Sequence, residues 1–145
     1  TALDLADARE GALFVVARDA TTAVSQLVAP ADRLDSSHDG TSDRNTPSRR
    51  DLLYLLEGRS ITDLDPNVLA ALASLDGAIV MDRAGRLLAA GAILRHPATA
   101  ELEDSSAVEG ARTTAALAAS RFGPVLKVSE DGIITFFDGE RVWDI

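Results

Sequence analysis

The chain has 145 residues, which suits one domain that buries a substantial core. It has no cysteine, which excludes disulfides, thiol nucleophiles and Cys-ligated metal centres and is compatible with a reducing cytoplasm, where we expect the protein to be. The net charge of −9 argues against a surface that coats nucleic acid, and the longest apolar run, 87–94, is far short of the ~20 residues of a membrane span.

The first thirty residues predict a helix followed by two strands. Apolar residues spaced between charged ones over 3–10 predict a short helix. After Gly11, the apolar run Ala12–Ala17 predicts a buried strand. A turn over 18–22 and a second strand over 24–29 complete a predicted hairpin.

The stretch from Pro30 to Arg50 is polar and predicts a flexible loop, because Leu34 is its single large aliphatic residue. Such a segment buries too little apolar area to offset its ordering entropy. A tolerated surface insertion is the favoured interpretation. The alternative is a loop that folds over a ligand through its arginines, which are Arg33, Arg44, Arg49 and Arg50.

Two helices are expected next. Ser48 and Asp51 form a variant capping box for a leucine-rich helix that ends at Gly58. Asp65 and Pro66 supply the N-cap and first position of a second helix.

The remaining chain predicts strands around one helix. A strand over 78–81 turns into a returning strand over 87–94, and a polar connection follows. Ser106 and Glu109 form a capping box for a helix that runs to about Arg121. Three short strands follow at 125–128, 133–137 and 140–143, joined by turns at Asp131-Gly132 and Asp138-Gly139.

This order of elements predicts an α/β fold, a mixed central β-sheet flanked by helices, in a single domain over 1–145. Because the chain begins at Thr1 rather than Met, we expect it to be a fragment of a longer protein.

Three short segments carry polar groups suited to a ligand. Asp76 precedes the small residues Gly77 and Ala78 at the start of a strand, where a carboxylate can bind a divalent cation or orient a hydroxyl while the backbone approaches the ligand closely. Taken alone, an aspartate in a turn is the favoured explanation of this segment.

The second segment is the beginning of the last helix, where Gly110 precedes Arg112, Thr113 and Thr114. Free N–H groups, an arginine and two hydroxyls suit a phosphate. Taken alone, however, an alanine-rich core helix with solvated polar residues is the favoured explanation. The third segment is Ser129-Glu130 at a strand end, where the serine can bond a base or phosphate and the glutamate an amine or a metal. A polar strand end is again the plainer explanation.

Other common sites are unsupported. His38 and His96 lack metal-type spacing to a partner, and the sequence contains neither a Walker A loop nor GxGxxG.

Taken in order, the features resemble the diadenylate cyclase (DAC) domain family, which joins two ATP molecules into cyclic di-AMP. The resemblance covers nearly the whole chain. It is carried by EGALFVVAR, LDGAIVMDRAGRLLAAGAIL and VLKVSEDGIITFFDGERV, at 10–18, 75–94 and 125–142. The family's Asp-Gly-Ala matches 76–78, its later glycine matches Gly91, and its Ser-Glu matches 129–130.

A second family motif, Gly-Thr-Arg-His-Arg-Ala-Ala, is only partly present as Gly110-Ala111-Arg112-Thr113-Thr114-Ala115-Ala116. In the family this segment holds the ATP phosphates, the aspartate of Asp-Gly-Ala assists metal binding and attack by the 3′-hydroxyl, and two domains of a dimer present their ATPs face to face. The resemblance therefore implies catalytic roles for Asp76 and Arg112, with Mg²⁺ or Mn²⁺ at Asp76. The implied nucleotide-binding residues are Gly77, Ala78, Gly91, Gly110, Arg112, Thr113, Thr114, Ser129 and Glu130.

The changed motif favours a divergent domain that binds ATP or a related cyclic adenine nucleotide as a sensor or degenerate cyclase in bacterial second-messenger signalling. An active diadenylate cyclase, a nucleotidyltransferase that releases pyrophosphate, is the first alternative, and the arginines of the 30–50 loop can supply the missing charge. A protein–protein assembly module without a nucleotide is the second. A homo-oligomer and a fused effector domain are the further partners expected.

Overall fold

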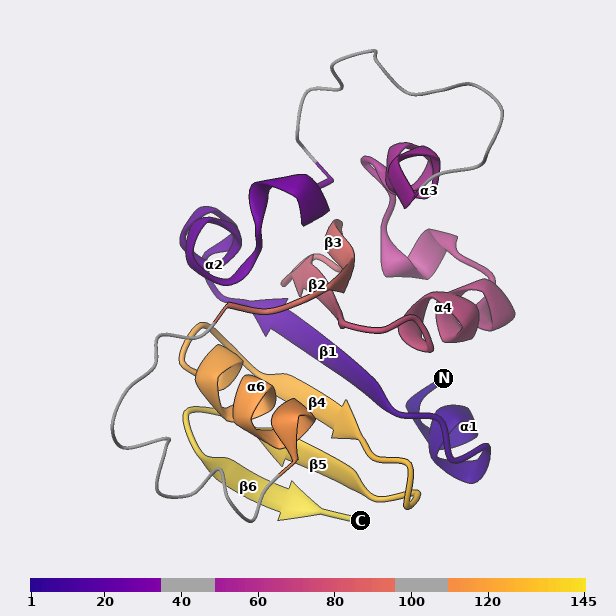
Figure 1. Ribbon diagram of the computed structural model, residues 1–145, viewed down its shortest axis with the longest axis vertical. Coiled ribbons are helices and arrows are strands. Elements are labelled where there is room, and N and C mark those ends of the chain that lie inside the picture. The colour runs from indigo at the N-terminus through magenta and orange to yellow at the C-terminus, as the bar shows by residue number, and fades with distance from the viewer. Residues whose placement is uncertain (35–48, 96–109) are drawn as a thin grey trace.

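A six-stranded sheet in the order β3-β2-β1-β4-β5-β6 forms the centre of the computed structural model (Figure 1). The structure describes residues 1–34, 49–95 and 110–145, without the side chains of 49–51. The innermost strands are β1 (Ala12–Ala17), β2 (Ala78–Asp82) and β4 (Val125–Val128). β1 pairs parallel with β2 and antiparallel with β4. The outer strands are β3 (Leu87–Ala92), β5 (Ile134–Phe137) and β6 (Arg141–Asp144), each antiparallel to its neighbour.

Helices cover both faces of this sheet (Figure 1). On one face lie α2 (Ala20–Leu27) and α6 (Ala111–Ser120). On the other face lie α1 (Ala2–Asp7), α3 (Arg49–Leu56) and α4 (Pro66–Ala73). The short 3₁₀ helices are η1 (Pro30–Asp32) and η2 (Ile61–Asp63). The predicted α/β fold, a mixed sheet flanked by helices, is therefore confirmed.

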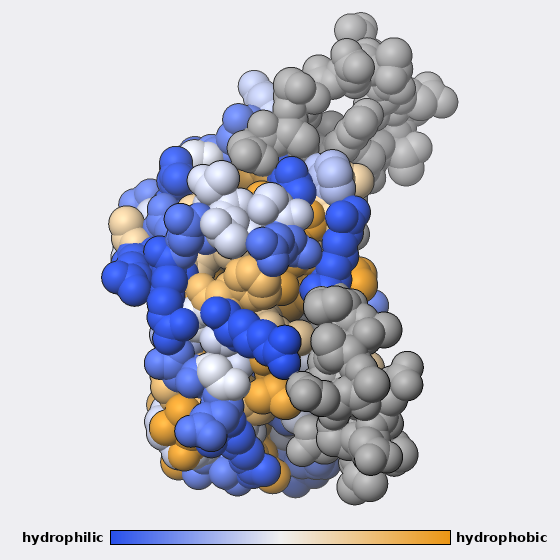
Figure 2. Space-filling model, turned by 90° about the vertical axis from the view of Figure 1, so that its left-hand side faces the viewer, coloured by the Kyte–Doolittle hydropathy of each residue, from blue (hydrophilic) through white to orange (hydrophobic). Residues whose placement is uncertain are grey.

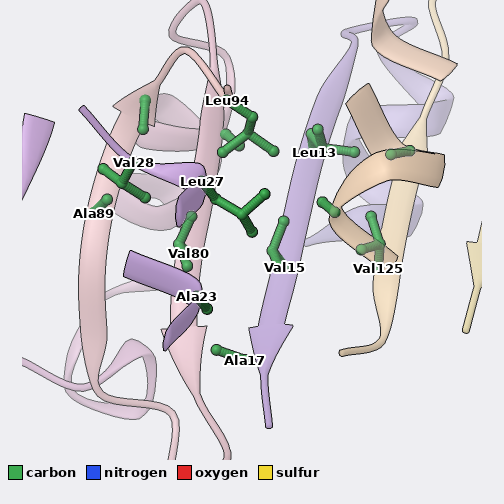
Figure 3. Packing of buried hydrophobic residues seen from close by; sticks show 14 of the residues in the cluster. Leu13, Val15, Ala17, Ala23, Leu27, Val28, Val80, Ala89, Leu94 and Val125 are labelled. Atoms are coloured by element: carbon green, nitrogen blue, oxygen red, sulfur yellow. The ribbon is translucent and has the colours of Figure 1, made fainter. Parts of the chain in front are cut away.

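The central strand β1 is apolar at every position and is covered by helices on both faces of the sheet. Leu13, Val15 and Ala17 face α2 and α6, together with Val80 and Val125 of the neighbouring strands (Figure 3). Burial of side chains in this layer contributes roughly 25 cal/mol per Å² of apolar surface, and it anchors the helix that borders the pocket described below.

The predicted α4 is confirmed together with its cap. Asp65 accepts a hydrogen bond from the backbone N–H of Asn67 at 2.8 Å, and Pro66 occupies the first position of the helix. Leu72 and Ala73 are buried against the sheet. Among the described residues, no helix has the length and apolarity that a membrane crossing requires.

The predicted hairpin after β1 is wrong, because residues 20–27 form the helix α2. Asp19 caps it by accepting a hydrogen bond from the backbone N–H of Thr22 at 2.7 Å, and this bond, with one from the Thr22 hydroxyl, lowers the pKa of the Asp19 carboxyl below its ordinary value of 3.8. Ala23, Val24 and Leu27 are buried in the core, and their spacing suits one helical face. The cap and this apolar stripe outweigh the β propensity of the valines.

The start of the predicted 30–50 loop is ordered, contrary to the expectation. Pro30–Asp32 form η1, and Leu34 is buried with its backbone N–H donating to Leu88 O at 3.1 Å. Arg33 donates through Nε and Nη2 to Val28 O at 3.2 and 3.1 Å. This arginine therefore holds its own backbone segment in place.

Much of the predicted loop and part of the last helix fall outside the described ranges. Residues 35–48, with Arg44 and the Ser48 cap, lie outside them, as do the side chains of Arg49 and Arg50. The capping box of Ser106 and Glu109 also lies outside. Within the described residues, α6 begins at Ala111 with Gly110 as its N-cap.

Candidate functional site

A pocket of about 660 Å³ lies at one end of the sheet, bordered by the start of β2, the end of β3, the end of β4 and the first turn of α6. Its volume is typical of small-ligand sites, which span ~300–1,000 Å³. Its described lining consists of Leu13, Asp76, Gly77, Ala78, Ala92, Ile93, Leu94, Gly110, Ala111, Arg112, Thr113, Ala115, Lys127, Ser129, Glu130 and Asp131. On the face of the molecule shown in Figure 2, apolar atoms reach the surface between hydrophilic side chains.

The first wall of the pocket is the segment that leads into β2. Asp76 is exposed, and Ala78 is buried as the first residue of the strand. Gly77 between them has φ +113°, and an added Cβ would lie 2.5 Å from the carbonyl carbon of Gly91. Only glycine fits here, because both the backbone conformation and the close approach of another strand exclude a side chain.

Gly91 supports this wall from β3 without being part of the pocket lining. Ala78 pairs with Ala92 and Val80 with Ala89, so β3 has one extra residue in this interval. Gly91 lies in it with φ +59°, which is the backbone of a β-bulge built on glycine. Gly91 therefore lies behind Gly77 and determines the backbone shape of this pocket wall.

The second wall is the N-terminal turn of α6. The N–H groups of Thr113 and Thr114 donate to Gly110 O at 2.8 and 3.3 Å. The amides of Ala111 and Arg112 precede these first helical bonds and point toward the N-terminal end, where the helix dipole is positive. Thr114 is outside the described lining, whereas Gly110, Arg112 and Thr113 belong to it.

Arg112 extends from this turn across the start of β1. An added Cβ on Gly11 would overlap Nη1 of its guanidinium, so the glycine provides the space in which the arginine lies. The same Nη1 is 3.2 Å from Oε1 of Glu130. Glu130 is 74% exposed, so this ion pair contributes at most about 1 kcal/mol and a ligand anion can replace the carboxylate as partner of the arginine.

Ser129 and Glu130 close the pocket where β4 ends. Ser129 Oγ accepts a hydrogen bond from Ile133 N–H at 3.2 Å, and the Ser129 and Ile133 backbones are also hydrogen-bonded. This serine therefore helps to form the β4–β5 turn, and its hydroxyl keeps a proton to donate.

Lys127 lines the pocket from β4 and was not among the site residues predicted from the sequence. Its Nζ donates to Thr113 Oγ1 at 2.8 Å. The signal was a lysine in an otherwise apolar strand, Val125-Leu126-Lys127-Val128. Lysine is rarely placed inside a sheet without a polar partner.

The pocket contains charges of both signs. Arg112 and Lys127 lie in it with the carboxylates of Asp76, Glu130 and Asp131. The described residues include no cluster of three or more metal-ligating side chains.

The sequence matches a protein family described as "DAC: DisA bacterial checkpoint controller nucleotide-binding" over residues 1–142. The chain belongs to this family. No curated protein shows significant similarity to the chain.

Solved structures support the same fold. A double mutant of DacA from Staphylococcus aureus is 24% identical with a TM-score of 0.53, and the similarity covers 99% of this chain and 81% of that one. A hypothetical membrane spanning protein from Bacillus cereus is 25% identical with a TM-score of 0.53, and the similarity covers 99% of this chain and 59% of that one.

Proposed function

We propose that this domain binds an adenine nucleotide, ATP or a related cyclic nucleotide, and acts as a sensor or degenerate cyclase. One observation carries the proposal. In a chain of the DAC family, residues from three distant segments line one pocket of small-ligand size. These residues are Asp76, Gly77, Ala78, Arg112, Thr113, Ser129 and Glu130.

Each wall of the pocket has a proposed role. The phosphates lie at the N-terminus of α6, where the dipole, the Ala111 and Arg112 amides and the Arg112 guanidinium favour an anion. The ribose or base lies against Gly77, where the absence of a side chain lets the ligand approach the backbone. Ser129 donates its hydroxyl proton to the ligand from the opposite side.

Mg²⁺ or Mn²⁺ is the proposed cofactor, bound by Asp76 together with ligand phosphates. Such an ion neutralises phosphate charge, which the protein needs because its own net charge is −9. Asp76 suits this role because it is exposed at the pocket.

The helix wall favours a sensor over an efficient catalyst. Thr113 and Thr114 stand where the family pattern has histidine and arginine. A charged hydrogen bond contributes roughly 1.5–3 kcal/mol, so loss of an arginine aimed at developing phosphate charge slows the reaction by ~10–100-fold or more. Binding tolerates this loss better than catalysis does.

An active diadenylate cyclase is the second candidate, favoured by the presence of Asp76 and Arg112 in the same pocket. In that reaction the 3′-hydroxyl oxygen of one ATP forms a bond to the α-phosphorus of the other. The bond from that phosphorus to the bridging oxygen breaks, pyrophosphate leaves, and the hydroxyl proton is released. A second round closes the ring. Two domains must face each other, so turnover rises more than linearly with protein concentration.

The experiment incubates the purified protein with ATP and Mg²⁺ or Mn²⁺, and measures products by mass spectrometry and the melting temperature in the same samples. A raised melting temperature without a product supports a sensor, since a ligand that binds only the folded state stabilises it. Asp76→Asn is expected to reduce this rise when metal is present, whereas an exposed carboxylate away from the pocket, Asp63→Asn, is the matched control.

Other outcomes assign a different function. Formation of cyclic di-AMP that is lost in Asp76→Asn establishes the cyclase. The absence of both product and stabilisation, across linear and cyclic adenine nucleotides, contradicts nucleotide binding and favours an assembly module.

A further inference from the structure

Lys127 occupies a position where a lysine needs an explanation. It lies in β4, an interior strand, and its register partners are Leu13 of β1 and Thr135 of β5. Leu13 lines the same pocket, and Thr135 is buried. The side chain of Lys127 is therefore directed to the α6 face of the sheet, beside the first turn of the helix.

The pocket also contains the carboxylates of Asp76, Glu130 and Asp131, but the first turn of α6 brings two cations and the positive end of the helix dipole together, which favours an anion at that turn. Lys127 Nζ is 2.8 Å from Thr113 Oγ1, so the ammonium group is held beside the positive end of the α6 dipole. Arg112 of the same turn lines the same pocket. A cation at the N-terminal end of a helix is unfavourable by itself, and a bound phosphate makes both the lysine and the helix end favourable.

The lysine also fits the change in the helix wall. The family pattern Gly-Thr-Arg-His-Arg has two arginines, and this chain retains Arg112 and has Thr114 in place of the second. Thr113, in place of the histidine, has the shorter hydroxyl side chain that Lys127 contacts. The positive charge absent from the helix is thus present on the neighbouring strand.

We propose that Lys127 is the second phosphate-binding cation of this pocket and that it makes the site selective for ligands with several phosphates. The inference rests on the proposed nucleotide binding and adds the residue that determines phosphate recognition. Lysine is a point charge without the bidentate geometry of arginine. Its contribution therefore grows with the number of phosphates that the ligand places in the pocket, from adenosine through AMP to ATP.

The experiment measures affinities for ATP, AMP and adenosine by calorimetry, with Mg²⁺, for the wild type and for Lys127→Met. Methionine keeps an unbranched apolar side chain of nearly the same length without the charge. We expect the ATP affinity to fall about tenfold or more and adenosine affinity to be unchanged, because only a charged hydrogen bond is lost. Lys127→Arg is expected to restore most of the ATP affinity.

Two further variants separate contact from general charge. Arg121→Met removes a positive charge at the opposite end of α6 and is expected to leave all three affinities unchanged. Thr113→Val removes the hydroxyl partner of Lys127 and is expected to weaken ATP binding less than Lys127→Met does. The salt dependence of ATP binding should also be shallower in Lys127→Met, and Lys127→Gln provides this comparison if the methionine variant does not fold.

The outcomes distinguish this inference from the proposed function. A wild type that binds none of the three ligands contradicts both. A wild type that binds ATP, with equal affinity and salt dependence in Lys127→Met, overturns the inference and leaves nucleotide binding intact. Equal losses for ATP and adenosine also overturn it, because they assign Lys127 to the shape of the pocket.

Discussion

The two walls of the pocket differ in what specifies them. The β2 wall depends on backbone geometry, because Gly77 and Gly91 both have positive φ and approach each other closely. The helix wall depends on side chains projecting from an ordinary α-helix, whose backbone accepts many residue types. The Asp-Gly-Ala pattern is complete in the first wall, and the family pattern is altered in the second.

This contrast indicates how a nucleotide pocket can change its chemistry while keeping its fold. Substitutions at Thr113 or Thr114 leave the helix backbone unaltered, so charge can be removed from this wall or supplied from β4. A substitution at Gly77 instead displaces the backbone of β3. We therefore expect changes in the β2 wall to affect stability and changes around the helix wall to affect affinity.

The largest expected effect follows from Gly77→Ala. The added Cβ lies 2.5 Å from the backbone of Gly91, and alanine must adopt the positive φ of Gly77. Together these effects lower the free energy of unfolding by about 3 kcal/mol. Thermal unfolding should show a melting temperature lowered by roughly 10 °C. Gly110→Ser is the control, because space around Gly110 is open and serine is a good N-cap. Equal stability of Gly77→Ala and the wild type would contradict the backbone account.

Gly11→Ala tests the helix wall without changing any residue of α6, because Gly11 precedes β1 and contacts Arg112. The added Cβ overlaps the Arg112 guanidinium, and a flexible side chain can move away at little cost in stability. We expect an almost unchanged melting temperature and an ATP affinity lowered several-fold, because the arginine leaves its place. Calorimetry with ATP measures this. Unchanged affinity, with Arg112→Met weakening binding strongly, would show that the arginine binds phosphate from another position.

The smallest effect is expected at Asp19, which caps α2 away from both walls. Asp19→Ala should lower the melting temperature by a few degrees at pH 7 without changing ATP affinity, because the Thr22 amide loses its acceptor. The folded pKa of Asp19 is lowered, so the stabilisation by its charge is complete above the ordinary value of 3.8 and is lost as the pH falls through the folded pKa.

Melting curves from pH 7 to pH 3 test this dependence. The difference between the wild type and Asp19→Ala should narrow at the acid end. Asp19→Asn should retain most of the cap without the charge. If Asp19→Ala has the same melting temperature as the wild type at pH 7, the cap does not stabilise α2.

Most of the sheet could be predicted from local patterns, and α2 could not. The apolar run of β1 predicts a buried strand, and the Asp-Gly pair before β5 predicts a hairpin turn. Residues 20–29 contain valines and threonines that suit a strand as well as a helix. Asp19 was assigned to a turn, and burial of Ala23 and Leu27 against β1 decides between the two structures.

The site was predictable where a motif marked it. Asp76 and Arg112 belong to recognisable patterns, and the fold brings both to one pocket. Lys127 belongs to none, and its place in the pocket depends on α6 packing beside β4, which is a tertiary contact. Gly91 was predicted from the resemblance as a ligand residue, and its bulge behind Gly77 needed the strand register to be known.

Amide chemical shifts of the isotope-labelled protein, titrated with ATP and Mg²⁺, test the central claim most directly. Binding between the two walls predicts saturable shifts that gather at residues 76–78, 110–113 and 127–130, while the amides of β6 at the far edge of the sheet stay unchanged. Shifts absent at saturating ATP, or gathered at β6, would contradict a nucleotide site in this pocket.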